Sequence, residues 1–318
     1  MPQSVSLYVG EELGHYSFGH DHPFGPRRQA AFWDAAHESG LDIWARLCHP
    51  VQVPSSAIER FHTPEYVALV KRLSQEGHGY LDAGDTPAFK GVYEAASFVV
   101  GSVLHAVQEI MERRTRRAFI PIAGLHHARP ERAAGFCVFN DLGVAIATLK
   151  HDYGLSRIAY VDIDAHHGDG VYYPFEADPS VIFADTHEDG RFLYPGTGHA
   201  YERGKGAGTG LKLNLPLPPR AKDEDFFAVW PAVEELLRAQ KPEFILLQGG
   251  TDCIAGDPIT HLEFSPRVHS FATTQLIAVA EELCEGRILV TGGGGYNLNN
   301  LARGWTAILR SLLEIPPL

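Results

Sequence analysis

The chain has 318 residues and a formal net charge of −12, with 45% hydrophobic and 21% charged side chains. This length and composition allow one large buried core, and the acidic balance argues against a nucleic-acid partner. No window approaches the roughly 18 consecutive apolar residues that a transmembrane helix needs, and "MPQSVSLYVGEELGH" lacks the regions of a signal peptide. We therefore expect a cytoplasmic protein with no membrane partner.

The four cysteines are spread along the chain without CxxC spacing. They are Cys48, Cys137, Cys253 and Cys284. This pattern argues against a disulfide framework and against a zinc site built from cysteines. Reduced thiols are the prediction.

Short apolar runs predict strands, and segments with helical periodicity lie between most of them. In chain order, the predicted strands cover 4–9, 117–123, 157–164, 180–186, 211–217, 243–250 and 287–295. The predicted helices cover 26–39, 64–75, 91–115, 138–151, 224–240, 266–285 and 299–313. This alternation predicts an α/β fold with a mainly parallel sheet covered by helices on both faces. Without a repeat or a low-complexity linker, one domain spanning 1–318 is expected.

Polar motifs follow four of the predicted strands. They are "GLHHA" at 124–128, "AHHGDG" at 165–170, "TDCIAGDP" at 251–258 and "GGGGYN" at 292–297. In open α/β sheets, ligands bind beyond the carboxyl ends of the strands. We therefore expect the His, Asp and Tyr side chains of these motifs to share one site.

A metal centre is predicted at the end of the strand 157–164. Asp162, Asp164 and His166 stand two residues apart, so a chain that stays extended would direct them to one face. Neighbouring carboxylates repel each other unless a cation or protons neutralise them. Catalytic zinc takes three such protein ligands, and Asp252 is the natural third beside Asp164 and His166. Fe²⁺ or Mn²⁺ also suits carboxylate ligands, and the alternative for Asp252 is a helix cap or turn residue.

The adjacent pair His126 and His127 has a different predicted role. At most one of them touches the reacting group as general base or acid, while the other acts electrostatically. Asp162 and Asp169 are the carboxylates available to orient their rings, although a plain polar loop is the alternative. Tyr296 follows glycines that let the backbone approach a ligand, and its phenol could donate to a developing oxyanion. Metal-assisted hydrolysis of an amide or ester is the predicted reaction class.

Longer motifs extend this pattern over nearly the whole chain. They are "FGHDHPFGPRR" at 18–28, "GDTPAF" at 84–89, "GLHHARPERAAGFCVFND" at 124–141, "VDIDAHHGDGV" at 161–171, "LYPGTG" at 193–198, "GTDCIAGDP" at 250–258 and "GGGGYN" at 292–297. In these motifs and their order the sequence resembles the zinc-dependent histone deacetylase superfamily, and within it the bacterial acetoin-utilisation-type deacetylases. Acetylpolyamine amidohydrolases are near relatives. The resemblance implies the three-layer αβα arginase–deacetylase fold and an amidohydrolase for an acetylated amine.

The resemblance also implies residue roles. It makes Asp164, His166 and Asp252 the ligands of Zn²⁺. The catalytic residues that it implies are His126, His127, Asp162, Asp169 and Tyr296. Among these, His127 backed by Asp169 is the general base and acid, and His126 backed by Asp162 is mainly electrostatic. Tyr296 then donates to the scissile carbonyl oxygen, and His167 is a bystander.

Substrate and cation contacts complete the implied site. The substrate-binding residues are Asp85 at the rim, Phe136 and Tyr194 on the tunnel walls, and Ile259. A structural potassium ion is implied around Asp162, Asp164, His166, Asp185 and Thr186. Four features depart from the family pattern. Tyr194 replaces a commoner phenylalanine, "IAGLHHA" replaces a glycine-rich lead-in, a carboxylate at Asp185 would change the cation site, and Ile259 offers no polar substrate contact.

Acetyl-lysine in proteins or peptides is the preferred substrate, and acetylated polyamines are the alternative. Two weaker readings are an arginase-like ureohydrolase with two manganese ions and a silent acetyl-lysine-binding module. The first would need an Asp-x-Asp pair where "GTDCIAG" offers only Asp252. Several acidic residues either form a rim that attracts cationic polyamines or simply face solvent. They are Glu11, Glu12, Asp21, Glu188 and Asp189.

Overall fold

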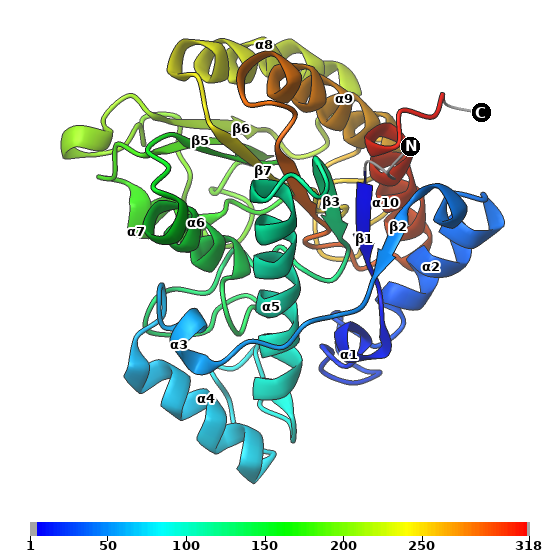
Figure 1. Cartoon of the computed structure of the whole chain (residues 1–318), viewed down its shortest axis with the longest axis vertical. Coiled ribbons are helices and arrows are strands. Elements are labelled where there is room, and N and C mark those ends of the chain that lie inside the picture. The colour runs from blue at the N-terminus through cyan, green and yellow to red at the C-terminus, as the bar shows by residue number, and fades with distance from the viewer. Residues whose placement is uncertain (1–4, 317–318) are drawn as a thin grey trace.

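A computed structural model describes residues 5–316, so Ser4, in the strand predicted over 4–9, and both ends of the predicted domain lie outside the described chain. Within that part the strands form one eight-stranded sheet in the order β2-β1-β3-β8-β7-β4-β5-β6 (Figure 1). The strands are β1 (Val5–Tyr8), β2 (Arg46–Cys48), β3 (Arg117–Ile120), β4 (Ile158–Asp162), β5 (Val181–Glu188), β6 (Lys212–Leu217), β7 (Phe244–Gln248) and β8 (Ile288–Thr291). Every neighbouring pair is parallel, which confirms the predicted sheet type.

All seven predicted strands are present, and the structure adds one. The added strand is β2, which is too short at three residues for its apolar pattern to stand out. The strand predicted over 157–164 ends earlier, at Asp162. Asp164 and His166 therefore lie on a loop, and the expectation of a continuous extended face is wrong.

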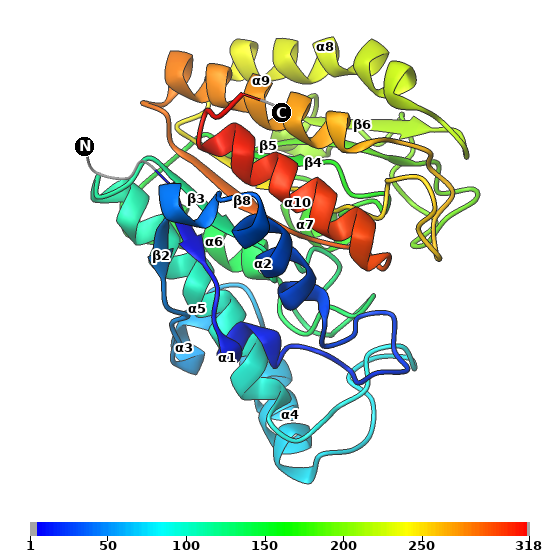
Figure 2. The ribbon, with the colours of Figure 1, turned by 90° about the vertical axis from the view of Figure 1, so that its right-hand side faces the viewer.

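Helices cover both faces of the sheet. They are α1 (Glu11–Gly14), α2 (Arg28–Glu38), α3 (Ser55–Ile58), α4 (Pro64–Glu76), α5 (Val92–Met111), α6 (Asp141–Tyr153), α7 (Asp169–Phe175), α8 (Asp223–Gln240), α9 (Pro266–Leu283) and α10 (Leu298–Leu312). Helices α2, α10, α9 and α8 pack in sequence on one face, and α5, α6 and α7 on the other, with α4 outside α5 (Figures 1 and 2). The predicted three-layer αβα fold is confirmed.

The helix ends follow from local sequence. At α4, the Thr63 side chain accepts a hydrogen bond from Tyr66 N, Pro64 occupies the first turn, and Gly77 ends the helix in the left-handed region. These are the residues that such positions favour. No described helix combines the length and the apolar character needed to cross a membrane.

The register of the sheet positions the four polar motifs. Ile120, Thr291, Gln248 and Asp162 pair with one another across β3, β8, β7 and β4, which are consecutive neighbours at the centre of the sheet. The loops that carry the polar motifs therefore leave the sheet at the same level and side by side. The predicted convergence at the carboxyl ends of the strands is confirmed for this part of the chain.

Candidate active site

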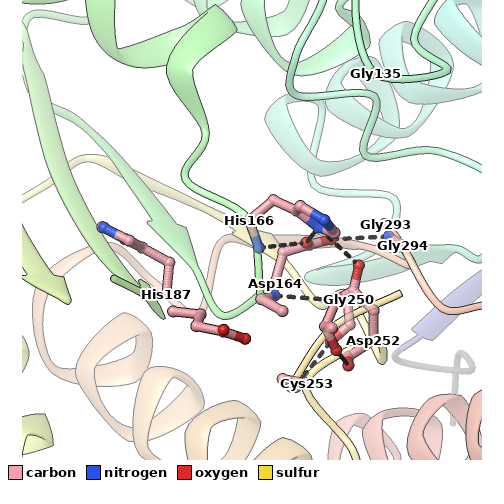
Figure 3. A network of polar contacts seen from close by, with 12 residues as sticks. Gly135, Asp164, His166, His187, Gly250, Asp252, Cys253, Gly293 and Gly294 are labelled. Atoms are coloured by element: carbon pink, nitrogen blue, oxygen red, sulfur yellow. Dashed lines mark hydrogen bonds and ion pairs between the residues drawn. The ribbon is translucent and has the colours of Figure 1, made fainter. Parts of the chain in front are cut away.

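Three buried side chains converge beyond the ends of β4 and β7. Nδ1 of His166 lies 3.0 Å from Oδ1 of Asp164 and 3.1 Å from Oδ2 of Asp252. Figure 3 shows these three residues directed toward one another. In a tetrahedral zinc site with bonds of about 2.1 Å, neighbouring donor atoms stand about 3.4 Å apart. The three donors therefore fit one divalent cation.

Hydrogen bonds from surrounding groups fix the two carboxylates. Asp164 Oδ2 accepts bonds from the Gln248 side chain at 2.8 Å and from Gly294 N at 2.9 Å. Asp252 Oδ1 accepts a bond from Ala165 N at 2.9 Å. Such contacts set the orientation of the carboxylate oxygens. Asp164 Oδ1, which also accepts from His166 N at 2.9 Å, and Asp252 Oδ2 are the oxygens nearest the His166 ring.

Two glycines make this close packing feasible. A Cβ added at Gly250 would lie 2.0 Å from Asp164 Oδ2, and one added at Gly294 would lie 2.1 Å from Asp252 Oδ2. Any side chain at either position would push a carboxylate out of the cluster. Gly250 and Gly294, which follow β7 and β8, thus allow the carboxylates of Asp164 and Asp252 to pack directly against the backbone.

The charges of the cluster favour a cation. Burial, and then the negative charge of Asp164, raise the pKa of Asp252 to about 7. Ionising both of two buried, neighbouring carboxylates is energetically unfavourable unless a positive charge lies between them. A divalent cation would supply that charge.

Each of the adjacent histidines is paired with its own carboxylate. Nδ1 of His126 lies 2.8 Å from Asp162 Oδ2, and Nδ1 of His127 lies 2.7 Å from Asp169 Oδ1. Arg129 donates to the other oxygen of Asp169 at 2.8 Å. The structure thus brings together both His–Asp pairs that the sequence predicted.

The two imidazoles differ in their tendency to hold a proton. Burial opposes protonation of His126, but the charges of Asp162 and Asp164 outweigh it and raise the pKa of His126 to about 9. Burial, together with the charge of His126, lowers the pKa of His127 to about 4. His126 therefore tends to carry a positive charge, and His127 stays neutral near pH 7, with one ring nitrogen without a proton.

Tyr296 lines the same small cavity as His127, Asp164 and His166. This cavity of about 10 Å³ is lined by His127, Asp164, His166 and Tyr296 among others, and it has room for roughly one water molecule. Tyr296 N donates to Asp257 Oδ2 at 2.9 Å, which fixes the residue. Burial, and then nearby carboxylates, raise the pKa of the Tyr296 phenol well above its usual value. The phenol is therefore a hydrogen-bond donor.

Aromatic side chains stand above the histidines. The Tyr194 ring meets His127 edge to face at 5.1 Å, and the Phe136 ring meets Tyr296 in the same way at 5.8 Å. These positions suit the tunnel walls predicted from the sequence. Ile259 is half-buried on the loop after β7, where its N–H donates to Asp257.

Asp85 lies in the outer cavity, which has a volume of about 690 Å³ and which it lines together with Tyr194. Asp82 Oδ1 accepts bonds from the backbone N–H of Gly84, Asp85 and Thr86 and so fixes the loop. Burial, and then the hydrogen bond and charge of Asp82, raise the pKa of Asp85 to about 6.

Of the predicted potassium residues, Asp162, Asp185 and Thr186 lie on the neighbouring strands β4 and β5, and Asp164 and His166 lie on the loop after β4. Thr186 Oγ1 donates to the carbonyl oxygen of Asp162 at 3.3 Å. Asp185 accepts bonds from Gly168 N at 2.8 Å and from His187 Nδ1 at 2.7 Å. His187 points away from the metal triad in Figure 3. The carboxylate that departs from the family pattern thus has a buried imidazole as its partner.

Two other expectations are resolved by burial. Glu188 is 1% exposed and pairs with His261 at 2.8 Å, and Asp189 is 8% exposed and pairs with Arg191. The suggestion that these two residues line an acidic rim or simply face solvent is therefore wrong. The four cysteines are free, as predicted.

Sequence reasoning missed several supporting residues. Gln248 holds Asp164, the Asp141 side chain accepts from the N–H of Gly124 and Leu125, and the hydroxyl of Tyr160 donates to Asp162. Gln248 is a fully buried polar residue that ends an otherwise apolar strand. A polar residue at the end of an apolar strand could have indicated that Gln248 belongs to the site.

Comparisons with known proteins agree with this geometry. The histone deacetylase domain matches residues 22–312. The chain belongs to the histone deacetylase family. The acetoin utilization protein AcuC of Bacillus subtilis (strain 168) is 34% identical, with 100% of this chain and 84% of the relative covered. AcuC of Staphylococcus xylosus is 30% identical, with 100% and 85% covered.

A solved structure supports the same conclusion for the fold. The crystal structure of the HDA15 HD domain matches with a TM-score of 0.89 and 28% identity, covering 98% of this chain and 88% of that chain. The resemblance to AcuC-type members of the deacetylase superfamily and the arginase–deacetylase fold are both confirmed. Family membership indicates a deacetylase acting on an acetylated substrate, and the family is in general metal-dependent.

Proposed function

We propose that the chain is a Zn²⁺-dependent amidohydrolase that removes the acetyl group from acetyl-lysine in proteins or peptides. One observation carries the proposal. The Asp164–His166–Asp252 triad, the His127–Asp169 pair and Tyr296 converge beyond four neighbouring strands. A metal site, a neutral base and a phenolic donor are the parts that amide hydrolysis needs.

The chain offers a place for each proposed ion. Asp164, His166 and Asp252 would hold Zn²⁺, with Fe²⁺ or Mn²⁺ as alternatives. A structural K⁺ ion would be held around Asp162, Asp164, His166, Asp185 and Thr186. A bound divalent cation supplies Lewis acidity toward the acetyl carbonyl and acidity to water.

The side chains around that ion have separate tasks in the proposed reaction. His127, whose Nδ1 is held by Asp169, accepts a proton from the attacking water at Nε2 and later returns a proton to the departing amine. His126, held by Asp162, adds positive charge nearby. Tyr296 donates its phenolic hydrogen to the carbonyl oxygen as negative charge develops there.

Three alternative functions remain to be distinguished by substrate. An acetylpolyamine amidohydrolase would use the same chemistry on a cationic substrate. An arginase-like enzyme would need a second metal, and among the described residues Asp164, His166 and Asp252 form the one group of three or more ligand side chains that could hold an ion. A silent binding module would not turn over any substrate.

A substrate panel tests the proposal. Protein loaded separately with Zn²⁺, Fe²⁺ or Mn²⁺ is assayed with acetyl-lysine peptides, acetylpolyamines and arginine, with acetate and urea as the measured products. We expect acetate release with the highest kcat/KM on an acetyl-lysine peptide. Faster hydrolysis of an acetylpolyamine, urea from arginine, or no product at all would overturn the proposal.

Replacing Asp169 with Asn is expected to lower turnover by about 10- to 100-fold, the range typical of partners that orient a site from the outer shell. The amide can still accept from His127, but it no longer supplies the negative charge that stabilises a protonated ring. Bound metal, measured by elemental analysis, should stay at the wild-type level. Wild-type turnover in this variant would contradict the role of Asp169.

A further inference from the structure

The outer cavity is lined by charged residues of both signs. It has a volume of about 690 Å³, and its charged lining residues are Asp82, Asp85, Arg129, Arg132 and Asp169. It also touches Gly135 and Tyr194, which contact His127, so it opens directly beside the proposed catalytic pair. The outer cavity shares Gly135 with the small cavity beside His127, so it is a place where a substrate chain could lie while its side chain enters the site.

The two arginines that line the outer cavity, Arg129 and Arg132, differ in their partners. A tight turn places Arg129 and Arg132 close together, since each backbone N–H of the two residues donates to the other's carbonyl oxygen. Arg129 is committed to Asp169 at 2.8 Å and packs over the Tyr173 ring. Arg132 is exposed, and its side chain has no hydrogen bond or ion pair with any residue from 5 to 316. Among the charged residues that line the outer cavity, Arg132 is therefore a positive charge without a side-chain partner in the described part of the chain.

Resting on the function proposed above, we infer that Arg132 is a specificity residue that recognises a carboxylate next to the acetylated lysine. Asp85, the rim residue implied by the family resemblance, lines the same cavity as Arg132, so a substrate held there can bring a carboxylate on an adjoining residue to Arg132. The planar guanidinium suits a carboxylate. A phosphate fits less well, because Asp82 and Asp85 repel a double negative charge more strongly.

The carboxylate has two sources, and peptides distinguish them. Wild-type kcat/KM is compared for four acetyl-lysine peptides. Three have an amidated C-terminus and carry neutral flanking residues, a Glu after the acetyl-lysine, or a Lys after it. The fourth ends at the acetyl-lysine with a free carboxylate. We expect one carboxylate peptide to exceed the neutral peptide by about three- to fivefold at low salt, a gain typical of an exposed ion pair. This preference should fade near 1 M salt, where charges are screened within about 3 Å.

Two substitutions assign the preference to Arg132. Arg132→Gln should bring the ratio of carboxylate to neutral peptide to about one, and Arg132→Glu should favour the Lys peptide. Arg113→Gln is the matched control, since Arg113 pairs with Glu285 at the opposite end of the strands and its variant should keep the wild-type ratio. Equal ratios in wild type and Arg132→Gln, or a carboxylate preference that survives Arg132→Glu, would overturn the inference. Failure of every protein to hydrolyse any peptide would instead overturn the proposed function.

Discussion

Replacing Asp252 with Asn is expected to remove the metal and abolish turnover. Asp252 contributes one of three converging donors. An asparagine amide has no negative charge, so it would bind a divalent cation more weakly than the carboxylate. Because outer partners of metal sites already cost 10- to 100-fold, the loss in metal affinity should exceed about 100-fold. Elemental analysis after dialysis, with acetate release measured in parallel, checks the result.

The amide side chain of the Asp252→Asn variant can still accept the Ala165 N–H, so the fold should persist, as circular dichroism would report. Asp152→Asn is a matched control, because Asp152 lies on α6 and pairs with Arg60 at 2.7 Å, away from the triad. It should keep one metal ion and full turnover. One tightly bound ion per chain in the Asp252 variant would contradict the assigned ligand.

Replacing Tyr296 with Phe is expected to lower turnover by about 10²- to 10³-fold, as the loss of one oxyanion donor usually does. The effect should fall on kcat more than on KM, since the hydroxyl matters most when charge develops on the oxygen. Bound metal should be unchanged, because the phenol is not among the three metal-binding donors. Steady-state kinetics and metal analysis test both statements.

The aromatic ring that remains in the Tyr296→Phe variant can keep the edge-to-face contact with Phe136, so the tunnel wall is preserved. Tyr153→Phe, on α6, removes a hydroxyl that is not part of the site and should leave turnover unaltered. If the Tyr296 variant turned over at the wild-type rate, oxyanion donation by this phenol would be ruled out.

The sequence was sufficient for the strand-end motifs, because apolar runs followed by His, Asp and Tyr need no knowledge of distant contacts. Strand spacing alone was insufficient for Asp162, whose pairing with His126 was implied by the family resemblance and is present in the structure. Two-residue spacing placed Asp162 with Asp164 and His166, but β4 ends at Asp162 and its carboxylate meets Tyr160 and His126 instead. Where a strand ends depends on its neighbours in the sheet, which spacing along one segment does not report.

Long-range packing explains the other misses. Gln248 reads as the end of a buried strand, and only its neighbours β4 and β8 reveal that it holds Asp164. Glu188 looked like a surface charge because His261, its partner, lies far along the chain. The proposed metal donors could be chosen from the sequence, since their chemistry restricts the residue types that can serve, and the structure brings those three side chains together.

The place of β8 in the sheet also determines when the sheet can be continuous during synthesis. β8 is the last strand in the chain, yet it lies between β3 and β7 and is the link between the strands β2-β1-β3 and the strands β7-β4-β5-β6. Without β8, the strands β2-β1-β3 and the strands β7-β4-β5-β6 share no strand-to-strand hydrogen bonds, and the edges of β3 and β7 are open. Such edges favour aggregation. The sheet is therefore continuous only once β8, the last of the described strands, has been added.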